Sequence, residues 1–319
     1  MKKLLACLMA ATLIFSGCGA NKGGESADTG EKGGEKVIAL SMNTLSNPFF
    51  VSVVEGCKAE AAEQGYEVIV TDAQDNPTTQ QKDIENLITK KPAAILIDPC
   101  DSDAIISSVE ACNAANIPVF TMDRRANGGE VIAHVGYDAV KSGNLAGEFL
   151  AKSLGGKGKV VELQGILGSN VAQERSKGFN EIMDKNPDIE IVARQTANFN
   201  RTEGLSVMEN ILQGNPEIDG IYCANDEMLL GALEAVNAAG RKDKIVMIGC
   251  DALDETIDAI KNGKVEATIA EPPFVLGRGI MNTAVKHLKG EKVEKDVVLK
   301  NKVLTKENVD SFDPKKPNE

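Results

Sequence analysis

From residue 36 onward, short apolar runs alternate with longer segments whose apolar residues recur every three or four positions. The short runs have the length of strands and the longer segments have helical periodicity. The runs 95–97 and 245–248 are apolar throughout, as strands covered by helices on both faces are. This alternation predicts α/β structure with parallel sheets and right-handed connections. The expected strands are 37–42, 66–71, 93–97, 119–122, 132–135, 159–163, 189–193, 218–223, 245–248 and 267–270, and expected helices include 49–64, 79–89, 103–116, 141–154, 203–213 and 228–239.

The number of expected strands indicates more than one core. The chain has 319 residues, and ten strands with their helices exceed what one hydrophobic core usually holds. Two lobes are therefore expected, each a doubly wound sheet with helices on both faces.

The first residues have the pattern of an export signal. Lys2 and Lys3 precede an apolar run over residues 4–15, which is too short for a membrane-spanning helix of about 20 residues. The run ends in Phe15-Ser16-Gly17-Cys18, which resembles the bacterial lipobox, although Leu is commoner than Phe at its first position. We expect residues 1–17 to be removed, Cys18 to carry lipid on the extracytoplasmic face of the cell membrane, and residues 18–35 to form a flexible tether. The alternative is an ordinary secretory signal in which Cys18 is incidental.

Charge and composition exclude several classes of protein. Asp and Glu number 47 against 35 Lys and Arg, a net charge of −12, which argues against nucleic-acid binding. The two His residues, His134 and His287, are too few for a His-based metal site. We find no phosphate-binding loop, and we expect no cofactor and no metal. The five cysteines after Cys18 are odd in number and lack CxxC spacing, which favours buried free thiols.

Ligands of parallel sheets bind beyond the carboxyl ends of the strands. The residues found there carry amides, carboxylates, guanidinium groups and a phenyl ring, a mixture suited to a polyhydroxylated ligand. They are Asn43, Asp98, Asp123, Arg124, Phe199, Asn225, Asp251 and Glu271, with Arg175 at the start of a helix.

Several motifs resemble the ribose-binding branch of the periplasmic sugar-binding proteins that serve ABC importers. They are the segments 44–50 (TLSNPFF), 98–103 (DPCDSD), 117–124, 225–228 (NDEM) and 249–251 (GCD). The resemblance implies two lobes joined by a three-strand hinge, with a sugar enclosed between them. One lobe would comprise residues 36–137 and 272–300 and the other 138–271 and 301–312, leaving 313–319 as a tail. The implied sugar contacts are Asn47, Phe49, Phe50, Asp123, Arg124, Arg175, Phe199, Asn225 and Asp251.

Four positions depart from the ribose pattern. Asn43 stands where that branch has Ser, Asp98 where it has Asn, Cys250 where it has Phe, and Glu271 where it has Gln. These changes predict a larger and more acidic pocket, suited to a hexose, cyclitol or amino-sugar. Ribose is expected to bind at least about tenfold more weakly than the best of these ligands, a difference of about 1.4 kcal/mol.

Structural alternatives exist for some of these residues. One of Phe49 and Phe50 could belong to the core, and Arg175 could form a surface pair with Glu174. Asp98 could cap a turn or a helix, and Glu271 could serve the hinge alone.

The expected function is that of an extracytoplasmic lipoprotein, not an enzyme, that captures a sugar or polyol as a monomer and delivers it to an ABC permease. A chemoreceptor or a quorum-signal receptor is an alternative within the same class. A carbohydrate-active enzyme with paired carboxylates, such as Asp98 and Asp251, is the alternative from another class. A sugar-responsive repressor would need an amino-terminal helix-turn-helix, where this chain has the lipobox and tether.

Overall fold

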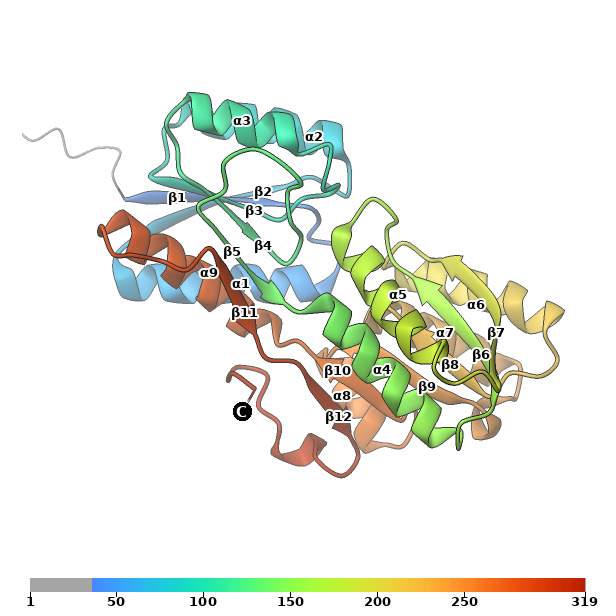
Figure 1. Cartoon of the computed structure of the whole chain (residues 1–319). Helices are drawn as coiled ribbons and strands as arrows, with labels where there is room; N and C mark the ends of the chain where they lie inside the picture. The colour runs from blue at the N-terminus through green and yellow to red at the C-terminus, as the bar shows by residue number, and fades with distance from the viewer. Residues whose placement is uncertain (1–35, 319) are drawn as a thin grey trace, which may run out of the picture. The chain divides into compact units, whose positions relative to one another are not determined.

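The computed structural model of the chain describes residues 36–318 (Figure 1). The predicted signal, the lipid site at Cys18 and the whole tether therefore lie outside the described residues. Between residues 36 and 318, no helix is long and apolar enough to cross a membrane.

The first sheet is parallel throughout and has the strand order β11-β5-β4-β3-β1-β2. We call the part of the chain built on it lobe one. Helices α2 and α3 cover one face of this sheet and α1 and α9 the other (Figure 1). The elements are β1 (Val37–Met42), α1 (Pro48–Gln64), β2 (Glu67–Asp72), α2 (Pro77–Thr89), β3 (Ala94–Ile97), α3 (Ile106–Ala114), β4 (Val119–Met122), β5 (Ala133–Tyr137), α9 (Pro273–Leu288) and β11 (Asp296–Leu299).

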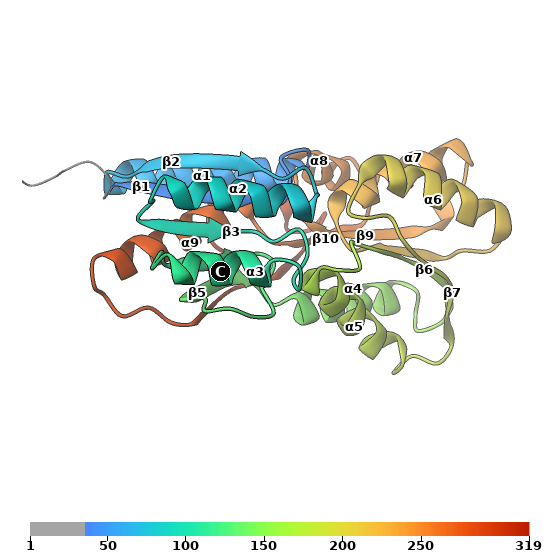
Figure 2. The same ribbon diagram turned by 90° about the horizontal axis from the view of Figure 1, so that it is seen from above.

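The second sheet has the order β12-β10-β9-β8-β6-β7 and forms lobe two. Figure 2 shows α4 and α5 on one face of it and α6 and α7 on the other. The elements are α4 (Ala139–Ser153), β6 (Gly158–Gln164), α5 (Asn170–Met183), β7 (Ile189–Thr196), α6 (Arg201–Gly214), β8 (Gly220–Cys223), α7 (Asp226–Ala238), β9 (Val246–Asp251), α8 (Asp254–Lys261), β10 (Ala267–Ala270) and β12 (Lys302–Thr305), with short 3-10 turns at Lys242–Lys244 and Val309–Ser311.

Three crossover segments join the lobes: Asp138 between β5 and α4, residues 271–272 between β10 and α9, and residues 300–301 between β11 and β12. The last crossover explains a departure from the expected all-parallel sheets, because β12 pairs antiparallel with β10. Strand β10 runs toward the crossovers, whereas β12 begins at one and runs away from them. The predicted fold class of two doubly wound α/β lobes is confirmed.

Asn and Asp side chains set the start of many helices. The side-chain oxygens of Asn47, Asn76, Asp138 and Asn200 accept backbone N–H groups in the first turns of α1, α2, α4 and α6, which satisfies donors that a helix leaves free. Helix α3 begins at Ile106, later than the expected residue 103. The cause is Asp101, whose Oδ1 accepts the N–H groups of Asp103 and Ala104 and so forms a separate turn.

The five cysteines in the described part of the chain are buried free thiols. Cys57 and Cys112 lie on the inner faces of α1 and α3, and Cys223 and Cys250 lie in the core of lobe two. Cys57 also donates to the carbonyl oxygen of Gly277 at 3.3 Å. These side chains therefore act as small core residues.

Candidate functional site

A cavity of about 270 Å³, including its opening to solvent, lies where the strand ends of both lobes meet. Both lobes contribute polar and aromatic side chains to its walls, as the strand-end rule for parallel sheets predicts. Nine of the twelve residues named from the sequence line this cavity: Asn47, Phe49, Phe50, Asp123, Arg124, Arg175, Phe199, Asn225 and Asp251. The tenth lining residue is Val171, which the sequence analysis missed.

Aromatic rings form the apolar walls. Phe49 and Phe50 open α1 directly after Asn47 and Pro48, and their rings meet edge to face with centroids 5.2 Å apart. Both rings line the cavity. Phe199 comes from lobe two, where its ring lies against the backbone of Gly165; a Cβ at residue 165 would lie 2.0 Å from the ring. Only glycine permits this close approach, so Gly165 positions the Phe199 ring.

The buried side chain of Arg124 contacts backbone carbonyl groups and two phenyl rings. Its side chain is 2% exposed, and its Nη1 donates to the carbonyl oxygens of Pro99 at 3.3 Å and Cys100 at 3.5 Å. The guanidinium carbon lies 5.4 Å from the ring centre of Phe50 and 5.5 Å from that of Phe199, which is cation–π distance. The Nε atom has no hydrogen-bond partner among residues 36–318. A buried donor of this kind is suited to a ligand hydroxyl.

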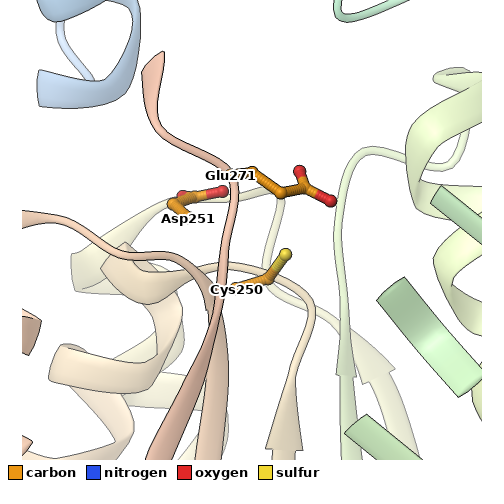
Figure 3. Close-up of side chains that lie close together, drawn as sticks. All are labelled: Cys250, Asp251 and Glu271. Atoms are coloured by element: carbon orange, nitrogen blue, oxygen red, sulfur yellow. The ribbon is translucent and has the colours of Figure 1, made fainter. Parts of the chain in front are cut away.

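Arg175 is the second buried guanidinium. Its Nη2 pairs with Glu271 and lies 3.6 Å from Oδ1 of Asp251, and its Nη1 donates to the carbonyl oxygen of Ala224 at 2.6 Å. Figure 3 shows Cys250, Asp251 and Glu271 with their side chains near one another, and their potential ligand atoms lie within 4.8 Å. One guanidinium nitrogen of Arg175 contacts both carboxylates, so Arg175 supplies positive charge to this cluster.

Several cavity residues have backbone conformations that are rare outside glycine. The backbone φ is +51° at Asp123, +57° at Phe199 and +127° at Asp251, and it is +64° at Ala252, which follows Asp251 outside the lining. Such conformations are unfavourable for side chains with a Cβ, and they cluster at binding sites. The turns after β4, β7 and β9 thus use strained backbone to direct side chains into the cavity.

Burial raises the pKa of both carboxylates that line the cavity. Desolvation raises the pKa of Asp123 and raises that of Asp251 well above its usual value, and Arg175 opposes both shifts. A desolvated carboxylate gains most from nearby hydrogen-bond donors. Sugar hydroxyls are donors of this kind. Asn225 caps α7 by accepting the N–H of Met228 at 3.0 Å, which holds its amide at the cavity wall.

The other three predicted residues, Asn43, Asp98 and Glu271, do not line the cavity. Oδ1 of Asp98 accepts the backbone N–H of Arg124 at 3.3 Å, and burial raises the pKa of this carboxyl well above its usual value. Among residues 36–318, the side-chain Oδ1 and Nδ2 atoms of Asn43 have no hydrogen-bond partner. The same is true of Oδ2 of Asp98. Glu271 pairs with Arg175 and also accepts from Ser142 and Asn301. It therefore connects the cavity to the crossover segments.

Two α/β lobes joined by three crossovers, with a polar and aromatic cavity at the strand ends of both sheets, define a two-lobed ligand-binding protein. The family model described as "Periplasmic binding protein domain" matches residues 38–292. The chain belongs to this family, as the sequence motifs predicted.

Relatives with known binding properties cover most of the chain. The ribose import binding protein RbsB of Bacillus subtilis (strain 168) is 40% identical over 299 residues, which are 93% of this chain and 97% of that protein. The D-apiose import binding protein of Actinobacillus succinogenes is 37% identical over 75% of this chain and 77% of that protein. The solved structure of an ABC transporter solute binding protein from Bacillus halodurans with bound myo-inositol has a TM-score of 0.84 and 34% identity, and the match covers 89% of this chain and 99% of that one.

Proposed function

We propose that this protein binds a sugar or cyclitol in the cavity between its lobes and delivers it to an ABC importer. The observation that carries the proposal is the cavity lining, in which both lobes supply phenyl rings and hydrogen-bonding groups. Phenyl rings pack against the C–H faces of a sugar, while planar amides, carboxylates and guanidinium groups pair with its hydroxyls. The import functions of the relatives support the same conclusion.

The charged side chains that line the cavity are compatible with a neutral ligand. Two guanidinium groups, Arg124 and Arg175, face two carboxylates, Asp123 and Asp251. The charges of the lining side chains balance in number, while Glu271 behind the wall shares Arg175 with Asp251 and adds one carboxylate. A neutral hexose, pentose or cyclitol fits this balance, and an amino-sugar is the alternative to be tested.

The enzyme alternative finds less support. The example pair for it is Asp98 and Asp251, and Asp98 is not part of the cavity lining. The family to which the chain belongs consists of solute-binding proteins.

The proposal extends to the location of the protein. Cys18 would carry lipid and hold the protein, as a monomer, on the extracytoplasmic face of the cell membrane, and residues 18–35 would be the tether. The basic and apolar segment before Phe15-Ser16-Gly17-Cys18 supports this assignment.

A binding screen tests the function. Ligand-stripped protein is heated with D-ribose, D-allose, D-apiose, myo-inositol or glucosamine, and hits are measured by calorimetry. A ligand at a hundredfold excess over its dissociation constant stabilises the folded form by about 2.7 kcal/mol, which is readily detected. Phe199→Ala should weaken binding of the best ligand about tenfold, whereas Val298→Ala, at a surface residue that is 60% exposed, should not. Absence of binding by the whole panel would contradict the proposal.

A further inference from the structure

A second set of contacts joins the lobes through residues that belong neither to the cavity lining nor to the crossovers. Ser102 follows β3 in lobe one, and Asn170 begins α5 in lobe two. The backbone N–H of Asn170 donates to Oγ of Ser102 at 3.2 Å, and this hydroxyl lies 3.4 Å from Oδ1 of Asn170. The backbone N–H of Ser102 donates to the carbonyl oxygen of Gly168 at 3.2 Å. Two short segments are thus bonded reciprocally across the lobes.

Asn170 also binds a second loop of lobe one. Its Oδ1 accepts the backbone N–H of Arg125 at 2.9 Å, and its Nδ2 donates to Glu174 on its own helix at 3.2 Å. The same amide is therefore oriented by lobe two and contacts the loops after β3 and β4 of lobe one. Neither Ser102 nor Asn170 lines the ligand cavity.

The backbone at Gly168 allows this approach. A Cβ at this position would lie 2.2 Å from Oδ2 of Asp101 in lobe one. Asp101 is not free to move aside, because its Oδ1 accepts the N–H groups of Asp103 and Ala104 at 2.9 and 2.8 Å. The two surfaces therefore meet as closely as glycine permits.

We propose that Ser102, Gly168, Asn170 and the backbone N–H of Arg125 form a closure latch that sets how long a bound ligand is retained. The proposal rests on the ligand binding proposed above. Every bond of the latch joins one lobe to the other, so all of them are lost when the lobes separate. An ordinary hydrogen bond corresponds to roughly a two- to tenfold change in an equilibrium constant. The latch thus stabilises the closed form without contacting the ligand.

This geometry has a kinetic signature. A ligand enters while the lobes are apart, and the latch bonds exist only in the closed form, which protein without ligand populates as a minority. Weakening the latch should therefore raise the dissociation rate constant and leave the association rate constant unchanged. The factor should be the same for every ligand, because none of the four latch residues lines the cavity. A residue of the cavity wall would instead produce factors that depend on the ligand.

The test compares Asn170→Ala with Gln173→Ala by stopped-flow fluorescence, using D-ribose and myo-inositol as probes. Because the chain has no Trp, the signal comes from an environment-sensitive dye on an introduced Val298→Cys, at a residue that is 60% exposed. Gln173 lies on the same helix, and its side chain donates to Leu167 at 2.8 Å within lobe two. We expect the dissociation rate constants of both probes to rise about fivefold, by equal factors, in Asn170→Ala. In Gln173→Ala they should equal those of the wild type. Unequal factors, a changed association rate constant or an unchanged dissociation rate constant would overturn the latch.

A crosslinking experiment separates failure of the latch from failure of the proposed function. The double variant Ser102→Cys/Asn170→Cys should form a disulfide faster than the control Ser102→Cys/Gln173→Cys under the same glutathione buffer. If neither probe binds the wild type, the proposed function fails. The crosslinking rates of the two double variants, measured without sugar, then test by themselves whether the latch forms. Crosslinking of Ser102→Cys/Asn170→Cys that is no faster than that of the control would overturn the latch.

Discussion

The guanidinium of Arg124 in lobe one lies 5.5 Å from the ring centre of Phe199 in lobe two. The same group lies 5.4 Å from Phe50 of its own lobe. Arg124 is therefore enclosed by rings from both lobes, and one of its two cation–π contacts exists only while the lobes are together.

We expect ligand to shift the protein toward this closed arrangement. Ligand-stripped protein should have a larger radius of gyration than the sugar-saturated protein, because the cavity draws its contacts from both lobes. Small-angle scattering measures the change, and Phe199→Ala should reduce it at the same sugar concentration. Identical scattering curves for stripped and saturated wild-type protein would count against closure.

Replacing Glu271 should affect both stability and binding. In Glu271→Gln, Arg175 loses its buried charge partner and retains Asp251 at 3.6 Å. Because a buried charge is left less well paired, the free energy of unfolding should fall by about 1–3 kcal/mol, and sugar affinity should fall with it. Urea unfolding and calorimetry provide the two measurements.

The matched control for Glu271 is Lys177→Gln. Lys177 forms an exposed pair with Glu181 at 3.9 Å, and its loss should change the unfolding free energy by no more than about 0.5 kcal/mol. Equal stabilities of Glu271→Gln and this control would show that the buried pair contributes nothing.

His134 should make the protein less stable in mild acid. Burial and the nearby Arg125 lower the pKa of His134 from 6.5 to about 3, and Asp296 opposes the shift. Below pH 6.5 the unfolded chain gains a proton on this residue while the folded protein does not, so stability falls as pH decreases toward 3. This residue should account for a loss of about 2 kcal/mol between pH 7 and pH 5.

The variant His134→Gln tests this assignment. Glutamine does not titrate, and its amide can still bond to Thr121, whose Oγ1 lies 2.9 Å from Nδ1 of His134. Urea unfolding at pH 5, 6 and 7 should show a shallower pH dependence in the variant. A dependence as steep as that of the wild type would assign the acid sensitivity to other groups.

The ranking of ligands tests the four departures from the ribose pattern. We expect D-ribose to bind at least about tenfold more weakly than the best hexose, cyclitol or amino-sugar. Cys250, Asp98 and Glu271 all lie behind the cavity wall, where Cys250 occupies less volume than Phe would. The double variant Asp98→Asn/Glu271→Gln should narrow the difference in affinity between ribose and the best ligand. Calorimetry that finds ribose to be the tightest ligand would refute this prediction.

The lipid anchor is tested at Cys18. In Cys18→Ala, the protein should leave the membrane fraction and appear in the medium, or accumulate as uncleaved precursor. Cell fractionation with immunoblotting distinguishes these forms, and Cys57→Ala, which alters a buried thiol of lobe one, serves as the control. A correctly processed Cys18→Ala protein that stays in the membrane fraction would rule out lipid attachment.

Much of the fold could be predicted because strand and helix periods are local properties of the sequence. The direction of β12 could not, since it depends on a crossover whose course is set by both lobes. The strand-end rule located the candidate site, but it does not distinguish a side chain on the cavity wall from one behind it. Asp123 therefore lines the cavity while Asp98, predicted by the same rule, bonds to the backbone of Arg124.

Other site features depend on tertiary contacts. Val171 lies one helical turn before Arg175 and faces the same cavity, and this spacing is a signal that the sequence offered. The role of Gly165 depends on the ring of Phe199, which is distant in the sequence. The latch at Asn170 likewise requires two lobes in contact, and no local pattern predicts it.

The burial of the native thiols has a practical consequence for following this protein in solution. Burial raises the pKa of all five described cysteines, that of Cys112 to about 11 and that of Cys100 to about 12. Reactivity toward maleimides requires an accessible thiolate, which these residues hardly provide near neutral pH. A cysteine introduced on each lobe could therefore carry a fluorescent dye while the native cysteines stay in place, and energy transfer between the dyes would report lobe movement in single molecules.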